Sequence, residues 1–174
     1  MEELVEVLLE NGKSTGKYIN KLKAHKQGIC HGISTIALID NKGRLLIQKR
    51  SSTKKDEPNK WDLSCAGHID INETPKDAAI REMHEELNII LDKKDLVLLD
   101  TYLNKIKLNE ETYINHYTYL YIVKKEIDIN EIIMNQEEVT SFRFVSKKEY
   151  NELLNNNQMV KAVKHCNKLL EYIK

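Results

Sequence analysis

Three glutamates, Glu82, Glu85 and Glu86, fall within one helical turn a short distance after Gly67. Residues three and four apart on a helix are neighbours, and like charges there repel by roughly 0.2–0.5 kcal/mol per pair. Such a cluster is either a solvated acidic face or a site that holds a divalent cation. Because Mg²⁺ takes oxygen ligands and leaves positions for water and phosphate, the cluster indicates metal-assisted chemistry on a phosphate ester or anhydride.

The elements that must position these glutamates are a loop and the helix that follows it. Thr74 is a suitable N-cap, Pro75 suits the first helical position, and Asp77 places an anion in the first turn. Asn88 suits the left-handed position that ends a helix. The apolar stripe Ala79, Met83 and Leu87 predicts a buried face that points largely away from the glutamates.

Residues 67–89 resemble the Nudix box, which is a long motif with fixed spacing. The matching positions are Gly67, Glu73, Arg81, Glu82, Met83, Glu85, Glu86 and Ile89. The one departure is Asn88, where the family has glycine, and asparagine is the next best residue for a positive φ angle.

The resemblance implies a role for each matching residue. Glu82, Glu85 and Glu86 would bind Mg²⁺ or Mn²⁺ and form the catalytic set, and the backbone carbonyl of Gly67 could add a ligand. Glu73 and Arg81 would fix the loop on the helix. A metal-activated water would attack phosphorus, with Glu85 or Glu86 as its base.

A second resemblance covers roughly residues 8–89 and is to type I isopentenyl-diphosphate isomerases, which share the Nudix fold. His25, His31 and His68 fall where those enzymes place three histidine ligands of a metal. Imidazole ligands suit Mn²⁺, Fe²⁺ or Zn²⁺, so the resemblance implies a second metal site. Each histidine taken alone would more often be an ordinary surface or core residue.

Two departures weigh against isomerase activity. The isomerase cysteine directly precedes the Gly-His pair, and Ala66 occupies that position here. The neighbouring Cys65 would point to the opposite face of an extended segment. The isomerase Glu-x-Glu is also missing from residues 113–117, although Glu110 and Glu111 lie just upstream. Hydrolysis is therefore favoured, with an isomerase or a non-catalytic nucleotide-sensing module as alternatives.

The resemblance implies cleavage of a diphosphate bond in a nucleoside diphosphate-linked or related small-molecule substrate, and several residues could contact it. Near the loop, the candidates for substrate binding are Lys49, Arg50, Lys54, Lys55 and Trp61, although solvation is an equally good explanation for Lys54 and Lys55. Glu137 or Glu138, in a loop before a strand, could supply a further metal ligand.

Composition bounds the remaining possibilities. The 174 residues fit one domain, and 27 basic and 27 acidic residues give zero formal net charge, which favours neither a nucleic-acid polymer nor a membrane as partner. Three cysteines without a CxxC pair and an acidic first segment favour the cytoplasm. A monomer and a homodimer are equally compatible with the sequence.

Periodicity predicts an α/β chain, a Nudix-like α/β/α sandwich with a central mixed sheet, formed by residues 1–174 as a single domain. Residues 1–31 form an N-terminal hairpin extension, with strands at 5–9 and 17–20. Further strands are expected at 32–39, 44–49, 61–66, 96–107, 112–123 and 141–145. The loop-helix spans 67–89, and C-terminal helices occupy 146–174, at 146–154 and 159–173.

Overall fold

The computed structural model describes residues 3–174 and is built on a seven-stranded sheet. Its main path runs β5 (Trp61–Asp62), β4 (Leu45–Arg50), β3 (His31–Ile39), β8 (Tyr113–Lys124) and β7 (Val97–Lys107). In addition, β6 (Cys65–His68) pairs with β3, and β9 (Val139–Val145) pairs with β4. The β3–β8 pair is parallel and the other pairs are antiparallel, which confirms the predicted mixed sheet.

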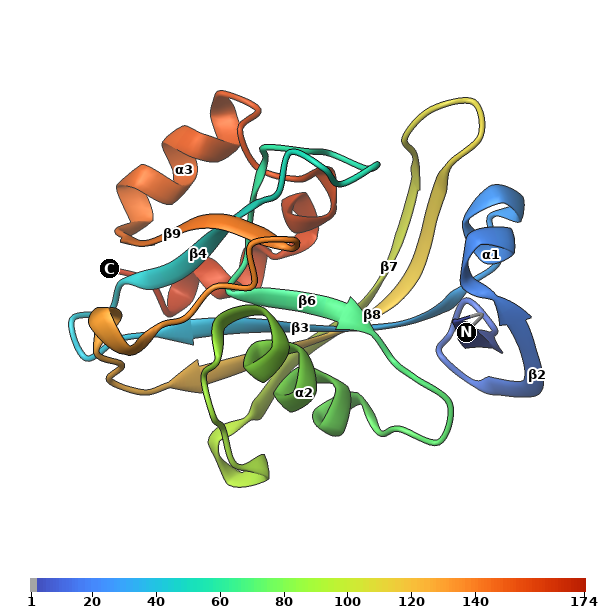
Figure 1. The fold of residues 1–174 in the computed structure, drawn as a ribbon, viewed down its shortest axis with the longest axis horizontal. Helices are drawn as coiled ribbons and strands as arrows, with labels where there is room; N and C mark the ends of the chain where they lie inside the picture. Colours follow the sequence, from blue (N-terminus) through green and yellow to red (C-terminus); the bar gives the residue numbers. More distant parts are fainter. Residues whose placement is uncertain (1–2) are drawn as a thin grey trace.

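Helical layers cover both faces of this sheet (Figure 1). Helix α2 (Pro75–Leu87) packs on one face, and α3 (Lys147–Asn155) with the C-terminal segment covers the other. Because both faces are buried, the second half of β3, residues 36–39, is a continuous apolar run rather than an alternating one. Ile36 and Leu38 face α2, whereas Ala37 and Ile39 face the C-terminal layer. The arrangement confirms the expected α/β/α sandwich.

The N-terminal extension is a hairpin followed by a short helix. Strands β1 (Leu4–Leu8) and β2 (Ser14–Asn20) pair as the sequence predicts. Helix α1 (Lys21–Gln27) was not predicted; the Asn20 side chain caps its start and Gly28, at φ 63°, ends it. This helix carries His25 to the end of the sheet where β3 begins.

Two sequence expectations need correction, and the two segments concerned contact each other. The expected strand 61–66 is interrupted at Leu63 and Ser64, so that β5 pairs with β4 while β6 pairs with β3. The expected helix 159–173 consists instead of two 3-10 segments, Lys161–His165 and Asn167–Glu171. Val160 is extended there and donates its N–H to the carbonyl of Trp61 at 2.8 Å.

The burial pattern explains why the C-terminal segment is a 3-10 helix. Between residues 161 and 171 the buried side chains are Val163, Cys166 and Leu169, spaced three residues apart. A 3-10 helix has three residues per turn, so this spacing places these three on one side. Within residues 3–174, no helix has the length and apolar character that a membrane crossing requires.

Candidate functional site

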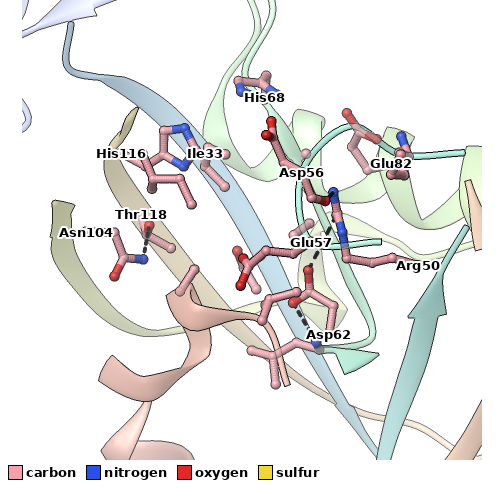
Figure 2. A pocket seen from close by; sticks show the side chains of 18 of the residues that line it. Ile33, Arg50, Asp56, Glu57, Asp62, His68, Glu82, Asn104, His116 and Thr118 are labelled. Carbon is pink, nitrogen blue, oxygen red and sulfur yellow. Dashed lines mark hydrogen bonds and ion pairs between the residues drawn. The ribbon is translucent and has the colours of Figure 1, made fainter. Parts of the chain in front are cut away.

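A cavity of about 600 Å³ opens where several parts of the chain meet. Its walls include the loop that follows β4, the polar face of α2, helix α1, the sheet strands β3, β6, β7 and β8, and the C-terminal segment. Figure 2 shows that side chains from these separate segments converge on one space. Charged and polar residues from distant parts of the sequence therefore lie in a single site.

The three glutamates of the Nudix box all line this cavity. Helix α2 is set as predicted: the Thr74 side chain accepts from the N–H of Asp77, and Asn88 at φ 55° ends the helix. Glu85 is the most exposed of the three, whereas Glu86 is buried and accepts a hydrogen bond from Gln48 Nε2 at 2.7 Å.

Arg81 ties the loop to the helix. It donates to Glu73 through Nε at 3.0 Å and through Nη2 at 2.9 Å, and to the carbonyl oxygen of His68 at 2.9 Å. Its Nη1 reaches Glu82 at 2.7 Å and Glu85 at 3.1 Å. These carboxylates hold the pKa of the guanidinium above its usual range, with Glu73 contributing most.

Glycine at position 67 is required by close packing against the acidic cluster. The carboxylate of Glu82 lies where a side chain at Gly67 would begin, so a Cβ atom there would overlap Glu82. The backbone of β6 therefore approaches the acidic cluster directly at Gly67, as a backbone carbonyl ligand would need to do.

The electrostatics of the acidic cluster favour a cation. Burial raises the pKa of Glu86 to about 8, and the charge of Glu82 adds to the effect. Burial is also the main cause of the raised pKa of Glu82. Carboxylates that are costly to ionise alone become stable anions beside a positive charge. The residues present thus fit a divalent metal held by oxygen ligands.

Four histidines meet at the α1 end of the cavity. The side-chain nitrogen atoms of His25, His31, His68 and His116 that could ligate a metal all lie within 4.8 Å of one another. His25 Nε2 and His68 Nε2 are 3.2 Å apart. The structure thus brings together the three predicted histidines and adds His116 as a fourth.

The four imidazoles are in the state that metal binding requires. Burial is the largest cause in each case: it lowers the pKa of His31 to about 4 and lowers the pKa of His25, His68 and His116. They are therefore neutral at pH 7. His31 Nδ1 bonds to the carbonyl of Ile29 at 2.8 Å, which leaves its Nε2 as a free acceptor. The Nε2 atoms of His31 and His116 are buried and have no hydrogen-bond partner in the part of the chain that the structure describes.

His116 was not among the residues predicted from the sequence. It lies in the segment 113–117, which lacks the carboxylates of an isomerase. The parallel register of β3 and β8 places His116 opposite His31. The signal that could have revealed it was a histidine in the segment where isomerases carry another metal ligand.

The remaining predicted residues divide into two groups. Arg50, Lys54, Lys55 and Glu138 line the cavity, and Lys54 forms an ion pair with Glu138. Lys49, Trp61, Glu137, Glu110 and Glu111 are not among the lining residues. The Lys49 ammonium lies 5.9 Å from the centre of the Trp61 ring, so these two residues contact each other instead of the cavity.

Alternation in β6 places Ala66 and Cys65 on opposite faces. Ala66 lines the cavity. Cys65 is buried on the α2 side among Ile36 and Met83, and burial raises the pKa of its thiol well above the usual range. The residue that faces the cavity therefore lacks a thiol, as the sequence predicts.

Comparison with known proteins places the chain in a family. The NUDIX domain model matches residues 31–166. An uncharacterised Nudix hydrolase of Listeria monocytogenes is 33% identical over 160 residues, covering 92% of this chain and 89% of the relative. An isopentenyl-diphosphate isomerase of Photorhabdus laumondii is 28% identical over 156 residues, covering 90% of this chain and 84% of the relative.

A solved structure from Deinococcus radiodurans has the same fold. It superposes with a TM-score of 0.72 at 18% identity and covers 99% of this chain and all of its own. The family generally depends on divalent metals. The match of the domain model, the Nudix box in its loop-helix and the related hydrolases together show that this chain belongs to the Nudix hydrolase family.

Proposed function

We propose that the chain hydrolyses a diphosphate bond in a small-molecule substrate, using Mg²⁺ or Mn²⁺ held by Glu82, Glu85 and Glu86. The observation that carries this proposal is that all three carboxylates line one cavity together with cationic side chains. A metal ion held by carboxylates and nearby cationic side chains are the groups that neutralise the charge of a diphosphate.

Each of these residues has a separate role in the proposed hydrolysis. Glu82, Glu85 and Glu86, with the carbonyl of Gly67, would hold the metal, which supplies charge neutralisation and a lowered pKa of water. Glu85 or Glu86 takes the proton of the attacking water. Arg81 positions Glu82 and Glu85 through its bonds to both. Arg50 and Lys54 face the cavity and bind phosphate oxygens.

We also propose that His25, His31, His68 and His116 form a second metal site. Four neutral nitrogen ligands favour Zn²⁺ or another transition metal over Mg²⁺. The unpartnered Nε2 atoms of His31 and His116 support the proposal, because buried polar atoms normally have a partner. An ion held here would join α1 to β3, β6 and β8.

An isomerase is the alternative enzyme, and the histidine cluster with the isomerase relatives is the observation in its favour. Ala66 stands against it, since no thiol faces the cavity at that position. A nucleotide-sensing module without turnover is the other alternative. The complete glutamate set argues against such a module, because binding alone does not need all three carboxylates.

The three cysteines are free, which supports our expectation of a reducing compartment, the cytoplasm. We propose a small molecule, rather than a nucleic-acid polymer or a membrane, as the substrate partner. Support comes from the zero net charge and from a cavity of about 600 Å³, which lies in the size range of small-molecule sites.

The test is a substrate panel assayed with Mg²⁺, with Mn²⁺ and with EDTA. It contains nucleoside di- and triphosphates, sugar nucleotides, dinucleoside polyphosphates and isopentenyl diphosphate, and products are identified by ³¹P and ¹H NMR. Metal-dependent release of phosphate or a phosphomonoester supports the hydrolase. Conversion of isopentenyl to dimethylallyl diphosphate would establish the isomerase, and tight binding without turnover would establish the sensor.

A further inference from the structure

The cavity extends past the metal-binding groups to a polar floor on the sheet. Asn104 on β7 and Thr118 on β8 lie there side by side, and both are almost completely buried (Figure 2). Asn104 Nδ2 donates to Thr118 Oγ1 at 3.4 Å, a long hydrogen bond. Among residues 3–174, Asn104 Oδ1 has no hydrogen-bond partner. Asn104 therefore belongs to the cavity lining and carries a buried polar atom whose bonding capacity is unused.

This vacancy does not depend on how the amide of Asn104 is turned. If the amide is rotated, Oδ1 accepts from the Thr118 hydroxyl and Nδ2 is the atom left over. A buried polar atom without a partner costs about 1–3 kcal/mol. Buried polar atoms in native proteins normally have a hydrogen-bond partner, so a bound molecule is the natural source of the partner that this atom lacks.

Asp62 adds a second acceptor to the same cavity. It is buried, its Oδ1 accepts from the N–H of Leu63 at 2.8 Å, and its Oδ2 lies 3.8 Å from Arg50 Nη1, beyond hydrogen-bond distance. One oxygen of this carboxyl group is thus under-used. Val163 from the C-terminal 3-10 segment adds an apolar group to the cavity wall.

We propose that Asn104, Thr118 and Asp62 form a subsite that hydrogen-bonds the organic half of the substrate. This half then carries hydrogen-bond donors, such as sugar hydroxyls or the N–H groups of a base, and is not a hydrocarbon chain. The proposal rests on the proposed function, since the diphosphate half is taken to occupy the glutamate end of the same cavity.

The physical consequence is selectivity by unmet hydrogen bonds. A prenyl chain on this floor would leave the free amide atom of Asn104 and the carboxylate oxygen of Asp62 buried and unpaired. Sites built to hydrogen-bond a substrate group reject analogues without that group far more strongly than apolar pockets reject an extra methylene. The floor therefore discriminates against prenyl diphosphates even though isomerases are among the relatives.

The experiment measures equilibrium binding by calorimetry with Ca²⁺ in place of the catalytic metal, so that turnover is not needed. The polar probes are ADP, UDP, ADP-ribose and UDP-glucose, the apolar probe is geranyl diphosphate, and pyrophosphate is the probe without an organic half. We expect at least one polar probe to bind tenfold or more tightly than geranyl diphosphate. Tighter binding of geranyl diphosphate than of every polar probe would overturn the proposal.

Asn104→Leu, which keeps the volume and removes the amide, should weaken the preferred polar probe at least tenfold and leave pyrophosphate unchanged. Equal weakening of both, or of neither, would overturn the subsite. Thr118→Val, an isosteric change, provides the same comparison if the leucine variant does not fold. A response of both UDP and UDP-glucose, or of both ADP and ADP-ribose, assigns the donor to the nucleoside; a response of the conjugate alone assigns it to the added sugar.

These binding results separate the subsite from the hydrolase. Polar selectivity without hydrolysis in the substrate panel would support the subsite and contradict the proposed function. Hydrolysis accompanied by a preference for the prenyl probe would support the function and contradict the subsite.

Discussion

Replacement of Arg81 tests whether the loop is held on α2 as the structure indicates. Arg81→Ala removes two bonds to Glu73 and one to the carbonyl of His68. It leaves the Glu73 carboxylate, whose side chain is only 14% exposed, without a cationic partner. Removing one partner of a fully buried pair costs about 3–5 kcal/mol. Because the Arg81 side chain is 27% exposed, we expect about 2–4 kcal/mol after allowing for solvent screening.

Conservative and distant variants make this prediction specific. Arg81→Lys keeps the charge but loses the two-pronged contact with Glu73, and we expect a loss of about 1–2 kcal/mol. Arg143→Ala removes an exposed arginine whose guanidinium lies 4.8 Å from the centre of the Trp61 ring, and should cost less than about 1 kcal/mol.

The assay is urea unfolding followed by far-UV circular dichroism at pH 7.5 with EDTA, so that bound metal does not contribute. A double-mutant cycle with Glu73→Gln should give a coupling energy of about 1–3 kcal/mol. Additive effects of the two substitutions, or a loss below about 1 kcal/mol for Arg81→Ala, would refute the structural role of the pair.

Three further perturbations have defined outcomes. Asp62→Asn should raise the free energy of unfolding at pH 7.5 but not at pH 3.5. Burial raises the pKa of Asp62 in the folded state from 3.8 to about 6. The wild type therefore loses up to about 3 kcal/mol of stability as pH rises through this window, and the substitution removes that loss. An equal gain in urea unfolding at both pH values would contradict this. His116→Ala should weaken Zn²⁺ binding, measured by calorimetry, at least tenfold (about 1.4 kcal/mol), and unchanged affinity would remove it from the metal site. Gly67→Ala should destabilise the fold by about 1–3 kcal/mol, because its Cβ would overlap Glu82; wild-type urea unfolding would show that the loop has room.

The loop-helix was predictable because its signals are local. Thr74, Pro75 and Asn88 act on backbone groups within a few residues, and the structure has them in the expected roles. Two-residue alternation was equally sufficient to separate Ala66 from Cys65. The layers on both faces of the sheet follow from apolar runs that need cover on both sides.

Apart from α1, whose capping residues Asn20 and Gly28 are local, the features that sequence missed depend on distant contacts. His116 joins the histidine cluster through parallel pairing with a strand more than eighty residues earlier in the chain. Val160 is extended where the sequence predicts a helix, and there it donates a hydrogen bond to the distant Trp61. Asn104 could not be recognised as part of a site until β7 was placed beside β8.

The central claim is that the carboxylates of α2 support metal-dependent hydrolysis, and the most direct test compares two matched glutamate variants. Glu86→Gln removes a buried carboxylate at the cavity, whereas Glu152→Gln removes an exposed one on α3. With Mg²⁺ and the best substrate of the panel, the account predicts that Glu86→Gln lowers kcat/KM at least 100-fold, about 2.7 kcal/mol, and that Glu152→Gln matches the wild type. Full activity of folded Glu86→Gln would contradict the account.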